Sequence, residues 1–148
     1  MASSALQKLI LAMPDAQHGT GVDAAQITAA ARTLGTRFPA DYSGFLARLG
    51  WAVIGPQEIF GPGSDLPLLW MDVAAVTAQE RLDGGLPAEL IAVHADRGGN
   101  FHCLDTSQVD AAGLAPVVFW AHDDQAHVRV VAPTFMAWLQ DLIARHRS

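Results

Sequence analysis

The sequence predicts an α+β fold in a single domain, residues 1–148, with helices packed against an antiparallel β-sheet. Two observations lead to this prediction. Apolar residues recur at helical spacing in the first third of the chain and again at its end, whereas the second half alternates short apolar runs with turns rich in Gly and Asp. Helices and strands that are segregated along the chain favour helices gathered on an antiparallel sheet. The 148 residues suffice to bury one substantial core.

Helices are expected in the first third of the chain. An N-terminal helix and loop, residues 1–22, comes first, with its apolar stripe ending at Met13 and the loop running from Pro14. Asp23, with Gln26 three residues later, forms a capping-box pattern for a second helix that ends at Gly35. A third helix follows Pro39 and stops at Gly50.

Strands dominate the rest of the sequence. Short strands are predicted at 51–54 and 58–60, the run 68–71 is ambiguous, and Asp72 caps a helix that ends near Gly84. Two hairpins follow, pairing 90–94 with 100–105 around a turn at 96–99, and 117–121 with 128–132 around a turn at 122–125. Thr134 begins a closing helix. The predicted core includes Phe45, Phe101, Phe119 and Leu139.

Composition excludes several classes of function. The chain is 51% hydrophobic and only 16% charged, with 15 acidic and 9 basic residues and a net charge of −6. An acidic chain lacks the cations that neutralise phosphates, so direct nucleic-acid binding is not expected, whereas a basic protein partner would suit it. The single cysteine, Cys103, lies in an apolar run and is expected to be buried and inert. No apolar run approaches 18 residues, so we expect a cytoplasmic protein that does not span a membrane.

Histidines near carboxylates raise one catalytic alternative, a small metal-dependent hydrolase. His94 lies near Asp96, His102 near Asp105, and His122 beside Asp123 and Asp124, with His127 following. Carboxylates in turns, however, commonly serve local hydrogen bonds. The chain carries no His-Glu-x-x-His, no Gly-x-Ser-x-Gly and no phosphate-binding loop. We therefore expect no enzyme, no catalytic residue, no metal and no cofactor.

Four segments in a fixed order carry a resemblance to a known family. They are Phe38-Pro39 with Tyr42 and Phe45-Leu46; Ile91 to Val93 with Gly98-Gly99-Asn100 and Leu104-Asp105; His122-Asp123; and Thr134-Phe135 with Trp138-Leu139. Over about residues 30–143 the chain resembles the SUKH superfamily, which contains bacterial immunity proteins and a fungal regulator of cell-wall synthesis. Two turn positions depart from the family pattern, Leu49 before Gly50 and Asn100 after Gly99, where Asn, Asp and Gly overlap in role.

The resemblance implies a protein that binds and neutralises a cognate toxin, such as a nuclease, by direct protein–protein contact. It also leaves a second possibility, a regulatory scaffold that binds an endogenous protein, as the fungal relatives suggest. The expected partner is a basic protein toxin, and the chain itself is expected to be a monomer or a weak homodimer.

Acidic turns and two tryptophans are the candidate partner-binding residues. Loops tolerate change and are a common place for specificity, and opposite charges speed association. Tryptophan is enriched among the residues that dominate binding energy. The candidates are Asp65, Asp96, Asp123 and Asp124, together with Trp51 or Trp70.

Overall fold

The computed structural model describes residues 8, 10–63, 65–96, 98–121 and 128–147. Within these ranges the strands form two antiparallel sheets, one ordered β1-β2-β3 and the other β4-β5-β6-β7. The strands are β1 Ala16–His18, β2 Ala52–Ile54, β3 Gln57–Ile59, β4 Leu90–Ala95, β5 Phe101–Asp105, β6 Val117–Trp120 and β7 Val128–Ala132. The helices are α2 Ala24–Leu34, α3 Ala40–Arg48, α4 Val73–Asp83 and α5 Phe135–Arg147, with short 3₁₀ turns η1 Leu69–Met71 and η2 Thr106–Gln108. The predicted α+β class is confirmed.

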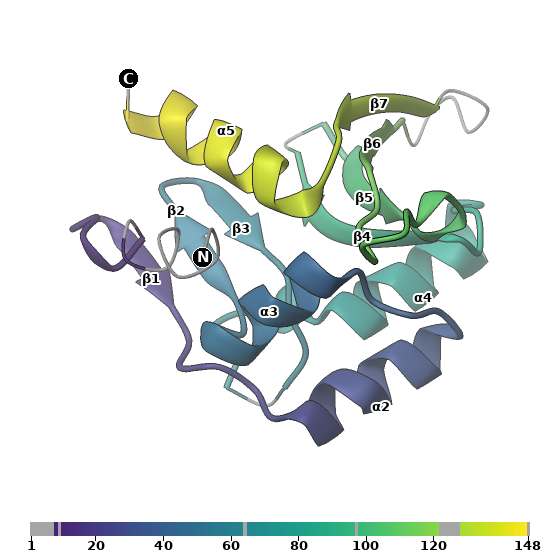
Figure 1. Cartoon of the computed structure of the whole chain (residues 1–148), viewed down its shortest axis with the longest axis horizontal. Helices are drawn as coiled ribbons and strands as arrows, with labels where there is room; N and C mark the ends of the chain where they lie inside the picture. Colours follow the sequence, from purple (N-terminus) through teal and green to yellow (C-terminus); the bar gives the residue numbers. More distant parts are fainter. Residues whose placement is uncertain (1–7, 9, 64, 97, 122–127, 148) are drawn as a thin grey trace.

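The helices cover the larger sheet from two sides. Figure 1 shows α5 above β2 and β3 and to the left of β6 and β7, with α4 and α2 below β4. The two sheets meet where β3 ends, because the Phe60 N–H donates a hydrogen bond to the Val93 carbonyl at 2.9 Å. One buried apolar cluster extends from Ile10 through both sheets to Ile143.

The helix ends follow the predicted capping residues. Asp23 accepts the N–H of Gln26 at 2.8 Å, and the Gln26 side chain accepts the N–H of Asp23 at 3.3 Å. Gly35 ends α2 in the left-handed region at φ 67°. Asp72 accepts the backbone N–H groups of residues 74 and 75, and the Thr134 hydroxyl accepts that of residue 137. Local sequence thus determines these boundaries.

The segment after Met13 differs from its prediction as a loop. Residues 16–18 form β1, which pairs with β2 so that Ala16 lies opposite Ile54 and His18 opposite Ala52. Three residues are too few to show a period-two pattern, so only the tertiary pairing reveals this strand. The N-terminal stripe does pack inward at Ile10, which is 1% exposed.

Helix α3 joins the small sheet to α5. The Tyr42 hydroxyl donates to the Phe60 carbonyl at 2.7 Å. The Tyr42 ring lies edge-on to Phe135 of α5, at 5.0 Å between ring centroids. Asp41 also accepts the backbone N–H of Met136 at 3.0 Å, so a side chain of α3 caps the first turn of α5. No local pattern in the sequence predicts this long-range cap.

Three of the four predicted core side chains are buried, namely Phe45, Phe101 and Leu139. The prediction for Phe119 was wrong, because its side chain is only half-buried. Trp138 of α5 covers this face of the sheet over β4 and β5. Phe119 lies one strand further out, where the guanidinium carbon of Arg129 lies 4.9 Å from its ring centroid.

Candidate protein-binding surface

The two candidate tryptophans have opposite environments. Trp51 is 8% exposed and packs against Gly19, where an added Cβ would lie 2.6 Å from the indole nitrogen. Trp70 is 57% exposed on η1, and its neighbour Leu69 is 92% exposed. Of the two tryptophans, only Trp70 exposes its ring to solvent, whereas Trp51 belongs to the core.

Backbone contacts hold the Trp70 turn in place. Met71 is fully buried directly after the exposed pair, and its carbonyl accepts the N–H of Gly61 at 3.1 Å. The Gly61 carbonyl in turn accepts the N–H of Val73 at 3.1 Å. The Trp70 indole N–H donates to the Glu58 carboxylate at 2.9 Å. The ring is therefore exposed yet fixed, which lowers the entropy lost when a partner covers it.

A hollow lies beside this ring on the outer side of α4. Its volume is about 330 Å³. We call its lining the Trp70 patch: Leu69, Trp70, Ala75, Val76, Gln79 and Glu80. Residues 75, 79 and 82 share one helix face by their spacing, and Leu82 is 83% exposed, so the apolar surface continues along α4.

The charges around the Trp70 patch are acidic. Glu80 belongs to its lining, and Glu58 holds the indole. Among the described residues that line the patch there is no lysine or arginine. The arginine of α4, Arg81, turns away and donates to the carbonyls of Leu34 at 2.7 Å and Ala88 at 2.6 Å. An apolar surface with an acidic margin matches a partner that offers apolar and basic side chains.

The candidate aspartates do not form one cluster in the described chain. Asp65 is exposed, five residues before Trp70 in the sequence. Asp96 is half-buried, and its Oδ1 accepts the N–H groups of Gly98 at 2.8 Å and Asn100 at 2.9 Å, so it stabilises its own hairpin turn. Asp123 and Asp124, with the predicted turn at 122–125, lie outside the described residues. Their part in binding stays a prediction.

A second hollow, of about 340 Å³, contains a histidine pair that the sequence did not bring together. His94 Nδ1 lies 3.0 Å from His102 Nδ1, and His94 Nε2 lies 2.6 Å from Gln57 Oε1. Because an amide oxygen only accepts, His94 carries its proton on Nε2, and its Nδ1 accepts the N–H of His102. Trp138 packs against both rings, with centroids at 5.4 and 5.6 Å. We call Gln57, His94, His102 and Trp138 the histidine pocket.

The histidine pocket keeps its imidazoles neutral. Burial, followed by the adjoining His102 ring, lowers the pKa of His94 from 6.5 to about 4. Burial also lowers the pKa of His102. In the structure residue 94 lies opposite residue 102, whereas the predicted turn at 96–99 would place it opposite residue 101, so the sequence did not predict this register.

The carboxylates of the hydrolase alternative have other roles in the structure. Asp96 belongs to its turn, and Asp105 accepts the N–H of Ser107 at 3.0 Å at the start of η2. Within the described ranges, no three His, Cys, Asp or Glu side chains converge in a way that could hold a metal ion. His122 and His127 lie outside those ranges. Cys103 is fully buried, and burial raises the pKa of its thiol.

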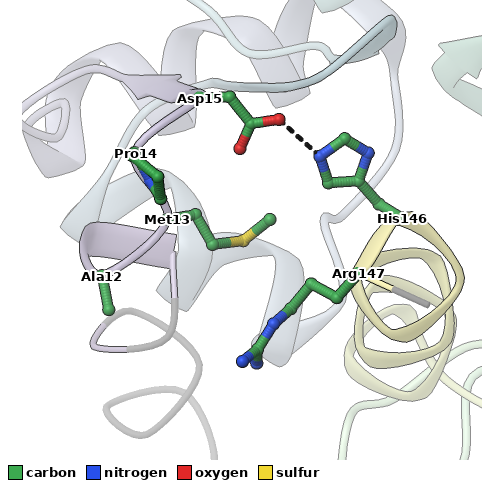
Figure 2. A pocket seen from close by; sticks show the side chains of 6 residues that line it. All are labelled: Ala12, Met13, Pro14, Asp15, His146 and Arg147. Atoms are coloured by element: carbon green, nitrogen blue, oxygen red, sulfur yellow. Dashed lines mark hydrogen bonds and ion pairs between the residues drawn. The ribbon is translucent and has the colours of Figure 1, made fainter.

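A third hollow, of about 330 Å³, separates the N-terminal segment from the end of α5. Figure 2 shows Asp15 reaching across it to His146, with an Oδ2–Nε2 distance of 2.7 Å, while Met13 lies beneath. Gly55 supports this contact, because an added Cβ would lie 2.4 Å from the His146 ring. The arrangement ties the first segment of the chain to the last helix.

The chain is similar to a known protein family and to a solved structure. The family model described as SMI1-KNR4 cell-wall, within the SUKH group, matches residues 4–144. A crystal structure of a protein from Pseudomonas syringae pv. tomato is similar, with a TM-score of 0.68, 19% identity and coverage of 95% of each chain. No curated protein matches. Across the described residues, no helix has the length and apolar character needed to cross a bilayer. By its family match the chain belongs to the SMI1-KNR4 family of the SUKH superfamily.

Proposed function

We propose that this protein is an immunity-type protein that neutralises a cognate toxin by stoichiometric contact through the Trp70 patch. Membership of the SUKH superfamily supports a role in protein–protein interaction. The observation that carries the proposal is the exposure of Trp70 and Leu69, at 57% and 92%, on a turn held by buried Met71. Folding gains little from an exposed tryptophan, whereas a partner that covers the ring gains one of the strongest anchors known in interfaces.

The charge of the chain favours a basic toxin. The net charge is −6, and Glu58 and Glu80 border the apolar centre of the Trp70 patch. Complementary fields raise the rate of encounter and favour the correct partner over others. Asp65 would add to this field, and we expect Asp123 and Asp124 to add to it as well. A toxin whose binding surface carries Lys or Arg around an apolar recess fits these features.

The test uses the protein encoded immediately upstream of this gene, purified in an inactive form for binding and in active form for neutralisation. We expect the active protein to arrest growth when expressed alone and to be neutralised when this chain is added at a one-to-one ratio. Calorimetry with the inactive form should give the same stoichiometry. The proposal fails if the upstream protein is harmless, or if it is toxic and neither binds this chain nor loses activity.

Two variants test whether the Trp70 patch is the contact surface, independently of whether the protein is an immunity protein. Trp70→Ala should abolish neutralisation at one-to-one ratio, whereas Leu11→Ala, at a residue that is 53% exposed near the N-terminus, should neutralise normally. If both variants neutralise the toxin fully, the immunity role stands and the contact lies elsewhere on the surface.

A further inference from the structure

A hollow of about 690 Å³ lies between the end of α2 and the start of α3. Hydrogen-bond donors predominate in its lining, and we call this site the arginine hollow: Thr28, Arg32, Thr36, Arg37 and Ser43. Among the described residues that line it there is no Asp or Glu. The net charge of the chain is −6, so two arginines without a carboxylate make this hollow a local exception.

The two arginines have no partner in the described part of the chain. Arg32 and Arg37 are exposed, and neither makes a hydrogen bond or an ion pair there. The last carbonyl of α2, at Leu34, accepts from Arg81 at 2.7 Å and so needs neither arginine as a cap. The helix dipole favours a cation at Arg32 in the last turn, but Arg37 lies outside the helix. Folding therefore does not explain why both guanidinium groups line one hollow.

A hydroxyl in the lining also lacks a partner. The Thr36 Oγ1 atom is buried and makes no hydrogen bond to the described chain. Because buried polar groups are normally hydrogen-bonded, an acceptor atom placed in the hollow would satisfy it. The hydroxyls of Thr28 and Ser43 line the same hollow. Three hydroxyls and two guanidinium groups can all donate, so the lining suits a ligand that is rich in acceptor oxygens.

We propose that the arginine hollow binds a small organic phosphate monoester, with Arg32 and Arg37 both contacting its phosphate group. The planar guanidinium fork matches a pair of phosphate oxygens and forms charge-assisted hydrogen bonds with them. Near neutral pH a phosphate monoester carries close to two negative charges, which two arginines balance. A single carboxylate would leave one arginine without a counter-charge.

The size and the walls of the hollow indicate an organic ligand. A volume of about 690 Å³ lies in the range of small-molecule sites and leaves space beyond a phosphate group. Ile27 and Ala31, both half-buried, give it an apolar wall for the rest of the ligand. A nucleic acid does not fit, because a chain with a net charge of −6 repels a polyanion. The basic toxin proposed for the Trp70 patch would be repelled by the arginines, so this ligand is separate from it.

Titration of the isotope-labelled full chain with phenyl phosphate, followed by NMR, tests the proposal. We expect saturable one-to-one binding that shifts the amide resonances of residues 28–43 and weakens as ionic strength rises. Phenol lacks the charge and should not bind, and inorganic phosphate lacks the apolar group and should bind more weakly. The proposal is overturned if phenyl phosphate shows no saturable binding, if the shifts lie elsewhere, or if either control probe binds as tightly.

A pair of variants separates the arginine hollow from the overall charge of the chain. Arg37→Gln should raise the dissociation constant for phenyl phosphate about tenfold or more, because it removes charge-assisted hydrogen bonds. The matched control is Arg147→Gln, which removes the same charge from an exposed arginine at the end of α5, on the opposite side of the molecule from α2 in Figure 1. This control should bind phenyl phosphate like the unmodified chain, and the NMR spectra should show both variants folded. Equal weakening in the two variants would show that net charge controls binding, and it would overturn the assignment of the site.

Discussion

The Trp70 patch and the histidine pocket take their side-chain partners from successive residues of β3. Gln57 binds His94, and Glu58 binds Trp70. Because neighbours on a strand point to opposite faces, one residue pair supports a buried polar site and an exposed apolar one. The histidine pocket hides groups that water would solvate, and the Trp70 patch exposes a group that water solvates poorly. The first arrangement concerns stability, and we propose that the second serves a partner.

We expect the largest effect on stability at Trp138, in the histidine pocket. Its ring is 2% exposed and packs against both imidazoles of the histidine pocket. Trp138→Ala should lower the free energy of unfolding by about 3–5 kcal/mol, since truncation of a buried aromatic leaves a cavity. Trp70→Ala should lower it by less than about 0.5 kcal/mol. Urea denaturation measures both values, and equal losses of unfolding free energy in the two variants would contradict this contrast between the two regions.

Acid should destabilise the protein through the histidine pocket. The pKa of His94 is about 4 in the folded chain and about 6.5 in the unfolded chain, so the unfolded state binds the proton first as pH falls. Neutral His94 makes its full contribution to the free energy of unfolding above pH 6.5. About 3 kcal/mol of that free energy is lost as the pH falls to about 4.

The measurement is urea denaturation at a series of pH values between 7 and 4. His94→Gln removes the titrating group, so the slope of unfolding free energy against pH in this window should fall by up to about one proton. Because the slope is compared and not the stability itself, a general loss of stability in the variant leaves the test valid. An unchanged slope would show that His94 does not titrate as its burial implies.

The smallest effect is expected at Glu58, where charge rather than packing is changed. Glu58→Gln keeps a side-chain oxygen for the Trp70 indole N–H and removes one negative charge beside the patch. Affinity for the toxin should fall by less than about 1 kcal/mol, mainly through a slower association rate at low salt. Stopped-flow association at two ionic strengths measures this, and an effect confined to dissociation would argue against steering.

Local sequence predicted the framework of the fold well. Asp23, Gly35, Asp72 and Thr134 end or begin helices through contacts a few residues away, and these positions were readable in advance. β1 was not readable, because its three residues become a strand only by pairing with β2. Phe119 was misplaced because strand alternation does not reveal how far a covering helix extends.

The candidate surface was only partly predictable, because burial depends on tertiary packing that the sequence does not show. The sequence named Trp51 and Trp70 as alternatives, since both border the Gly- and Pro-rich segment, and burial separates them only in three dimensions. Leu69 and Leu82 were missed as surface candidates, because a hydrophobic pattern does not distinguish an exposed apolar residue from a core residue. The histidine pocket was missed because each histidine was paired with its nearest acid, whereas the register of the hairpin joins the histidines to each other.

The central claim is that Trp70 serves a partner and not the fold, and one paired measurement tests it most directly. The dissociation constant for the cognate toxin and the free energy of unfolding should both be measured for the unmodified chain and for Trp70→Ala. We predict that binding weakens by about 2 kcal/mol or more, roughly 30-fold, while stability changes by less than about 0.5 kcal/mol. Unchanged affinity, or a loss of stability large enough to account for the weaker binding, would contradict the account.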